Sequence, residues 1–122
     1  MQAPALIMLL KRKHTDKGLM AGSPLRFDPH GRTGGFLLNG EMTFRTSAPA
    51  IREAASIIDA SYTPLQFDLS GVSRADSAGV GLLIEWQRLA ARARCELRYI
   101  NMPKSLESIM RVTGVLGMLP VD

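Results

Sequence analysis

The stretch "FDLSGVSRADSAGVGLLIEW", Phe67 to Trp86, decides the fold of this chain. Apolar side chains alternate at its start and predict a strand over residues 65–70, whereas the spacing from residue 77 predicts a long helix to about residue 94. The residues at the joint, 76–79, are aspartate, serine, alanine and glycine. A catalytic serine, a phosphate site, a phosphorylation site or a plain helix cap could each explain this combination.

Two strands and a helix are predicted before this stretch. Leu25–Asp28 and Phe36–Asn39 flank a turn that contains two adjacent glycines, and this pattern predicts a β-hairpin. Thr46 or Ser47 can cap the helix that follows, and its apolar spacing ends near Asp59–Ala60.

One strand and one helix are predicted after it, over residues 96–101 and from Pro103 to a glycine C-cap at Gly114. The strand 65–70, the long helix and the strand 96–101 form a right-handed βαβ unit, so these two strands should be parallel. The sequence therefore predicts a single α/β domain. Its leading hairpin and parallel βαβ unit form a small mixed four-stranded sheet, packed with about three to four helices.

Composition restricts the class of protein. A chain of 122 residues with 46% hydrophobic and 21% charged residues is typical of one globular domain with a modest core. The lone Cys95 has no intramolecular disulfide partner, which favours a reducing, cytoplasmic compartment.

The net charge of +4 is concentrated in the first 24 residues, which have four basic side chains against one acid. The other 98 residues carry 11 basic and 10 acidic side chains, so the domain has no strong basic stripe and nucleic-acid binding is not expected.

Residues 1–24 are predicted to be a flexible leader that is possibly non-native, and residues 25–122 the domain. The apolar run 3–10 precedes its basic residues, which is the reverse of a secretory signal, and it is too short to span a membrane. The alternative is a short basic-apolar segment that touches a membrane surface.

Catalytic, cofactor and metal chemistry find little support. The only histidines, His14 and His30, belong to no catalytic pattern, and "ADSAG" is not the G-x-S-x-G nucleophile elbow. The glycines Gly79 and Gly81 lack the third glycine of a dinucleotide fingerprint, and one cysteine with two scattered histidines gives no metal-ligand spacing. The sequence predicts a protein that is not an enzyme and needs no cofactor or metal.

A helix cap is the simplest reading of Asp76 and Ser77, because both side chains can accept hydrogen bonds from free backbone N–H groups, typically worth ~1 kcal/mol. Capping does not explain Gly79 and Gly81, since each glycine costs a helix roughly 1 kcal/mol relative to alanine. Close packing of the helix on the sheet, or a surface that a partner protein approaches closely, would explain them.

The motif "DLSGVSRADSAGVGLLIEW", with "LLNGEMTFRTSAPAIREA" before it and "YINMPKSLESIMRVTGVLGMLP" after it, resembles the STAS domain family over about residues 25–120. Two branches of the family compete. The run "SRADSAG", the continuation "LLIEW" and the ending "VTGVLGMLP" look closer to the STAS subunit of the Mla lipid-asymmetry ABC transporter than to the anti-sigma-factor antagonists.

The resemblance implies which residues meet a partner. The family's contact or switch hydroxyl falls on Ser77, and the expected partner-binding residues, from the motif and from the first helix beside it, are Arg74, Asp76, Ser77, Ala78, Gly79, Ala50 and Ile51. Ala78 departs from the antagonists, which often carry a second hydroxyl residue at that position.

The function implied by the Mla-like branch is a non-enzymatic cytoplasmic subunit that binds and supports the ATPase of a phospholipid-transport ABC transporter. It would meet the inner membrane only through the transporter. The other branch implies an anti-sigma-factor antagonist that a partner serine kinase switches by phosphorylating Ser77.

Overall fold

The computed structural model describes residues 24–122. The predicted leader, apart from Pro24, lies outside the described residues. The elements, in chain order, are β1 (Arg26–Pro29), β2 (Gly35–Met42), α2 (Ser47–Asp59), β3 (Leu65–Ala75), α3 (Ser77–Arg92), β4 (Leu97–Ile100), α4 (Lys104–Thr113) and the 3-10 turn η2 (Leu116–Met118).

The four strands form one mixed sheet in the order β1-β2-β3-β4. β1 pairs with β2 antiparallel, and Phe27 lies opposite Leu38. β2 and β4 both pair with β3 in parallel. The predicted hairpin, the parallel βαβ pair and the mixed four-stranded sheet are therefore confirmed.

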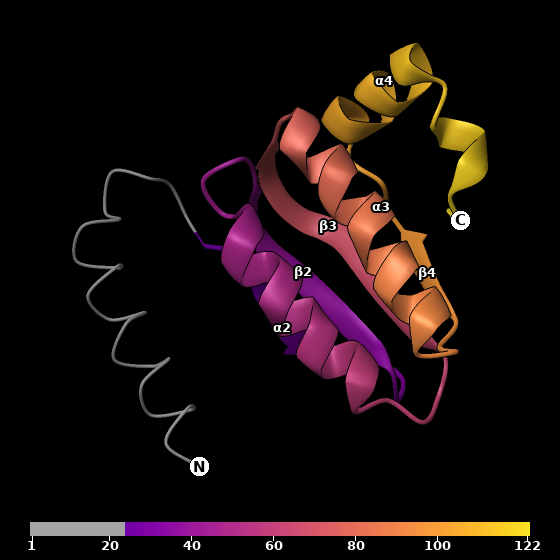
Figure 1. The fold of residues 1–122 in the computed structure, drawn as a ribbon. Coiled ribbons are helices and arrows are strands. Elements are labelled where there is room, and N and C mark those ends of the chain that lie inside the picture. The colour runs from indigo at the N-terminus through magenta and orange to yellow at the C-terminus, as the bar shows by residue number, and fades with distance from the viewer. Residues whose placement is uncertain (1–23) are drawn as a thin grey trace.

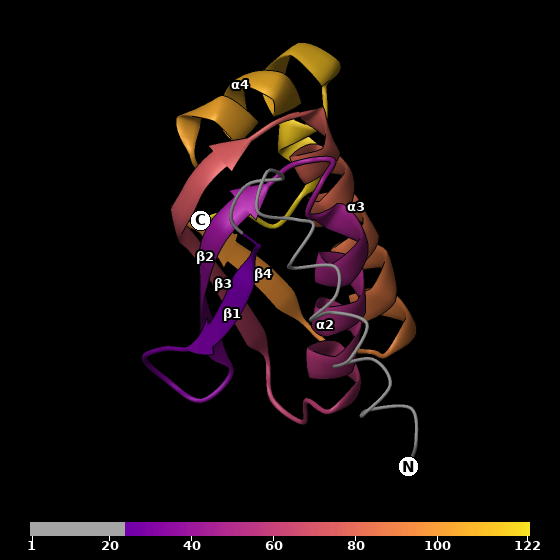
Figure 2. The same ribbon diagram turned by 90° about the vertical axis from the view of Figure 1, so that its left-hand side faces the viewer.

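The helices are not distributed evenly around the sheet. α2 and α3 lie side by side over one face, and α4 crosses the end of the sheet at which β3 ends (Figures 1 and 2). The opposite face has no helix over it among the described elements. There β3 presents polar residues, which are Gln66, Asp68 and Ser70.

Aromatic rings fill the centre of the covered face. Phe67 on β3 meets Trp86 on α3 edge-to-face, with ring centroids 5.5 Å apart, and meets Phe27 at 5.6 Å. Tyr99 on β4 closes the cluster, and its buried hydroxyl donates a hydrogen bond of 2.7 Å to the Leu83 carbonyl. Burial raises the pKa of this phenol. The aromatic contacts of Trp86 fix α3 to β1, β3 and β4, and so fix where α3 begins.

Two strands are longer than predicted. β2 continues from Asn39 to Met42, and β3 continues through the predicted polar loop to Ala75. The extensions pair with each other across two register shifts. Gly71 permits this, because a Cβ there would lie 2.1 Å from the Asn39 Oδ1 atom. The prediction of a loop over residues 71–75 is wrong. These residues have no local apolar pattern, and they form a strand because they pair with β2, which is distant in the sequence.

The helix ends follow the prediction with smaller differences. α3 ends at Arg92 and not at residue 94. α4 ends at Thr113, and its predicted C-cap, Gly114, has a φ of 77°, which is the left-handed conformation of a glycine C-cap. Thr46 is the N-cap of α2, but its side chain makes no capping hydrogen bond.

The last residues of the chain cover the outer edge of β4. The Tyr99 N–H donates to the Pro120 carbonyl at 3.0 Å, and the Asp122 N–H donates to the Tyr99 carbonyl at 2.9 Å. Arg98 forms an ion pair with the Asp122 carboxylate. These contacts occupy backbone groups that an edge strand would otherwise leave open.

Candidate functional site

Asp76 connects the start of α3 to the loop between β2 and α2. One carboxylate oxygen accepts a hydrogen bond of 2.9 Å from the Ala78 N–H, which makes Asp76 the N-cap of α3. The other accepts one of 3.2 Å from the Phe44 N–H, and the Asp76 N–H donates to the Met42 carbonyl at 3.2 Å. The capping interpretation is confirmed for Asp76, and the same side chain also holds a loop 32 residues away.

Ser77 is the first residue of α3 and is exposed. Its hydroxyl makes no hydrogen bond to any residue from 24 to 122, so the cap of α3 belongs to Asp76 alone. This exposed hydroxyl lies at a helix N-terminus, where negative charge is favoured.

The two glycines of α3 differ in whether the structure requires glycine at their positions. Gly79 is buried, and a Cβ there would lie 2.8 Å from both the Leu106 Cδ2 atom and the Met42 carbonyl oxygen. Gly81 is exposed and a Cβ there would meet nothing within 4 Å. Close packing of α3 on β2 and α4 therefore explains Gly79, and it does not explain Gly81.

The loop between β2 and α2 is fixed from within. The Thr46 hydroxyl accepts a hydrogen bond of 3.0 Å from the Thr43 N–H and donates one of 2.6 Å to the Glu41 carbonyl. The loop directs Phe44 away from the core, and this side chain is 80% exposed. Phe44 is not among the residues predicted from the sequence, although a large aromatic residue between polar residues just before a helix cap is a usable signal.

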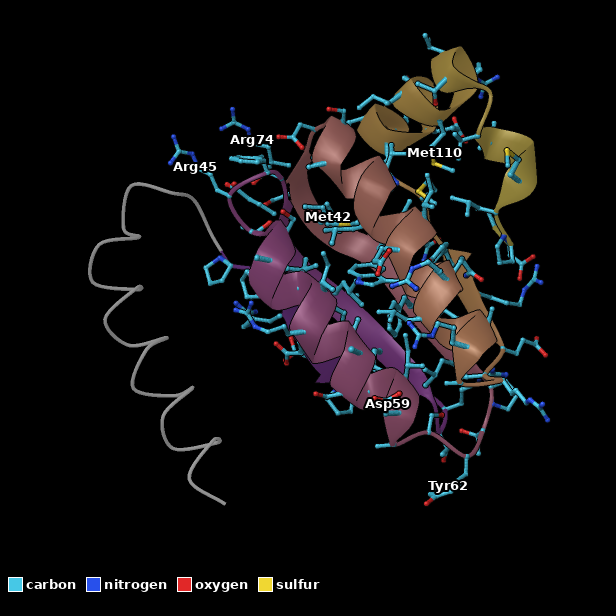
Figure 3. The ribbon with its side chains drawn as sticks, in the orientation of Figure 1. Met42, Arg45, Asp59, Tyr62, Arg74 and Met110 are labelled. Atoms are coloured by element: carbon cyan, nitrogen blue, oxygen red, sulfur yellow. The ribbon has the colours of Figure 1, made fainter. Side chains whose placement is uncertain are left out.

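These segments form one exposed area, here called the Ser77 surface and defined as Phe44, Arg45, Arg74, Asp76 and Ser77. The hydrogen bond between Asp76 and Phe44 brings its two halves together. Figure 3 shows Arg45 and Arg74 projecting outward at the same end of the molecule, with Tyr62 at the opposite end. Neither arginine forms an ion pair with any acid among residues 24–122.

The remaining predicted partner-binding residues lie deeper. Ala78 and Ile51 are partly buried, whereas Ala50 and Gly79 are buried. The interpretation of Ala50 and Gly79 as direct contact residues needs correction, because a buried residue cannot touch a partner unless the domain rearranges. Both support the Ser77 surface from beneath.

The other chemical features lie away from this surface or are missing from the described part of the chain. Among residues 24–122, no three His, Cys, Asp or Glu side chains are grouped to hold a metal ion. A shallow hollow lies at the other end of the sheet and is lined by Ser61, Tyr62, Thr63, Pro64, Arg94, Cys95 and Glu96. Partial burial is the main cause that raises the pKa of the Cys95 thiol, which works against its use as a thiolate nucleophile.

Residues 25–120 match a family model described as "Mlab, STAS domain". The chain belongs to the STAS domain family. STAS domains act through protein–protein interaction, and the match indicates no catalytic family. No helix in the described part of this STAS chain combines the length and the apolar character that crossing a membrane requires.

Solved STAS structures share the fold at low sequence identity. An anti-sigma factor antagonist from Mycobacterium paratuberculosis aligns with a TM-score of 0.64 and 15% identity, covering 80% of this chain and 84% of that one. The phosphorylated Bacillus cell fate determinant SpoIIAA aligns at 0.58 and 17%, covering 80% and 88%. An antagonist-type STAS domain protein from Planctomyces limnophilus aligns at 0.61 and 10%, covering 81% and 89%. Among curated protein sequences, none matches the chain significantly.

Proposed function

We propose that this STAS chain is a non-enzymatic subunit that docks through its Ser77 surface on the ATPase of a phospholipid-transport ABC transporter. The observation that carries the proposal is the match of residues 25–120 to the Mla-type STAS model. On this proposal the protein is cytoplasmic, needs no cofactor, and reaches the inner membrane only as part of the transporter.

The geometry of the Ser77 surface supports docking there. The Asp76 carboxylate accepts hydrogen bonds from the Phe44 N–H of the β2–α2 loop and from the Ala78 N–H of α3, so the surface is preorganised and loses little conformational entropy on binding. Ser77 lies at the helix N-terminus, where a negative charge is stabilised by ~0.3–1 kcal/mol. A charge added there would alter docking while the domain stays folded.

Co-expression with the cognate ATPase subunit tests the proposal. We expect the two proteins to purify as a complex and Ser77→Glu to dissociate it, since the new carboxylate adds charge and bulk at the contact. Ser56→Glu is the matched control, because Ser56 is an exposed serine on another helix, α2, and is not part of the Ser77 surface. A complex that forms equally well with Ser77→Glu would refute docking at this surface.

Gly79 is unsuitable as a docking probe. Any side chain at Gly79 would meet the Met42 carbonyl oxygen at about the 2.8 Å given by a Cβ alone, so Gly79→Arg would disturb the fold before it reported on a partner. Ser77 and Gly81 are exposed and can be changed without this difficulty.

The second candidate is an anti-sigma-factor antagonist, and the exposed, unbonded Ser77 hydroxyl favours it. Asp76 next to it opposes a phosphate, which carries about −1.5 to −2 charges at neutral pH. Incubation with ATP and the anti-sigma kinases of the same organism is the test. Labelling that is lost in Ser77→Ala would support this function, and an unlabelled wild-type protein would exclude it.

A further inference from the structure

Both backbone polar groups of Phe44, its N–H and its carbonyl, form hydrogen bonds to side chains. Its N–H donates to the Asp76 carboxylate at 3.2 Å, and its carbonyl accepts a hydrogen bond of 3.0 Å from the Ser47 hydroxyl. The bonds of Thr46 to the loop hold the same turn from beneath. An 80% exposed phenyl ring on such a fixed turn differs from a mobile surface residue, because its position is set before any partner arrives.

Two arginines without an acidic partner among residues 24–122 lie near Phe44. Arg45 follows it directly, and Arg74 lies at the end of β3, two residues before the Asp76 that bonds to Phe44. The Asp76 carboxylate already accepts two backbone hydrogen bonds, and Glu41, opposite Arg74 in the sheet register, forms no ion pair with it. Both guanidinium groups are therefore available to an external carboxylate.

We infer that the partner offers an apolar pocket for Phe44 that is bordered by acidic side chains, which meet Arg45 and Arg74. The inference rests on the proposed docking function and names the partner chemistry that this surface selects. Aromatic and arginine side chains are the residues that interface centres enrich, and a buried aromatic anchor often carries much of the binding free energy.

Two other occupants fit the charge less well. The first 24 residues of the chain carry a net charge of +3, which the two arginines would repel. A second copy of the chain in a twofold contact would bring four arginines into one interface, because each copy contributes the same patch. A separate acidic partner removes both conflicts.

Binding kinetics of the full chain with the purified cognate ATPase test the inference. We expect Phe44→Ala to weaken binding by about 10-fold or more, mainly through faster dissociation, because an interface anchor is lost. We expect the double variant Arg45→Glu, Arg74→Glu to slow association about 10-fold and to flatten its dependence on salt.

Matched controls separate this effect from general damage. Tyr62→Ala removes a fully exposed aromatic ring at the opposite end of the molecule. The double variant Arg32→Glu, Arg92→Glu reverses two exposed cations, one in the hairpin turn and one in the last turn of α3. We expect both controls to bind within about 2-fold of wild type. All variants should remain folded, because the altered side chains are exposed, with a slightly lower unfolding temperature where Arg74→Glu faces Glu41 and where Arg92→Glu lies at a helix C-terminus.

The outcomes distinguish the inference from the function on which it rests. If wild type binds the ATPase and Phe44→Ala binds equally well, the inference fails and the docking function stands. If wild type does not bind, the proposed function fails and the inference falls with it. A self-association of the free chain that Phe44→Ala abolishes would assign Phe44 to a second copy. A photo-crosslink from position 44 of the free chain into residues 1–23 would assign it to the leader, and either result overturns the inference.

Discussion

Gly79 and Gly81 flank Val80 on α3, and their surroundings differ completely. The position of Gly79 is filled by Met42 and Leu106 up to the limit of van der Waals contact, while the position of Gly81 is open to solvent. The same residue type is thus required for packing at one position and is free to change at the other. Substitution by alanine separates the two cases.

We predict that Gly79→Ala lowers the free energy of unfolding by about 1–3 kcal/mol, because overpacking outweighs the roughly 1 kcal/mol gained in helix propensity. Gly81→Ala should raise it by up to about 1 kcal/mol, since only the propensity changes. Urea unfolding of both variants measures the difference. Equal effects of the two substitutions would contradict the packing explanation.

Asp76 should prove to be a bridge as well as a cap. We predict that Asp76→Ala costs about 1–2 kcal/mol, because the Ala78 N–H loses its cap and the Phe44 N–H loses its acceptor. Asp76→Asn should cost less, since the amide oxygen can still cap α3 but the amide nitrogen cannot accept from Phe44.

Amide hydrogen exchange at Phe44 is the measurement that isolates the bridge. Faster exchange at Phe44 is expected in Asp76→Ala and in Asp76→Asn, while protection at Ala78 is lost only in the first. Unchanged exchange at Phe44 in both variants would show that the loop holds itself without Asp76.

At the scale of elements, the sequence predicts the helices and strands whose apolar residues repeat with a regular helical or strand spacing. β1, β4, α2, α3 and α4 each lie within a few residues of the prediction, because their buried faces can be read locally. The second half of β3 could not be predicted, since "GVSRA" has no alternation and forms a strand only by pairing with β2. Capping by Asp76 follows from local chemistry, whereas its bond to Phe44 depends on the same distant pairing.

Asp68 ties β3 to the end of β4. Its carboxylate accepts hydrogen bonds of 2.9 Å from the Ser70 N–H and from the Asn101 side chain, and Asn101 has a positive φ of 56°. Partial burial raises the pKa of Asp68, but these hydrogen bonds lower it by more, so the pKa lies below its ordinary value. The bonds therefore stabilise the fold above the ordinary pKa and are lost as pH falls through the lowered one.

We predict that wild type loses more stability than Asp68→Asn when the pH falls from 7 to 3, since only wild type has this carboxylate to protonate. Urea unfolding at both pH values gives the comparison. Asp59→Asn, on the exposed end of α2, serves as the control and should behave as wild type does. A parallel loss in wild type and Asp68→Asn would remove Asp68 from the acid response.

For the whole molecule, the sheet has two edges that are protected differently. β1 is a strand of four residues that ends in Pro29, and a short edge with proline offers little to pair with. β4 is covered by the chain's last residues through the bonds of Tyr99 to Pro120 and Asp122. The tail thus takes the place of a fifth strand.

We predict that deleting residues 120–122 lowers the free energy of unfolding by about 1–3 kcal/mol, as two backbone hydrogen bonds and an apolar contact are lost. The deletion should also produce association at high protein concentration, because the edge of β4 becomes open. Light scattering detects it. Asp122→Asn keeps the backbone bonds and should associate no more than wild type, and a deletion variant that also associated no more than wild type would argue against edge protection.

Trp86 gives the molecule a natural optical reporter. It is the only tryptophan of the chain, it is fully buried between Phe27 and Phe67, and its indole N–H meets no hydrogen-bond acceptor among residues 24–122. Its fluorescence should therefore be blue-shifted in the folded protein and move to the red on unfolding. Trp86 lies nine residues beyond Ser77, or roughly 13 Å along α3. Its emission can then follow folding in the presence of a bound partner, with the signal of the core separate from events at the surface.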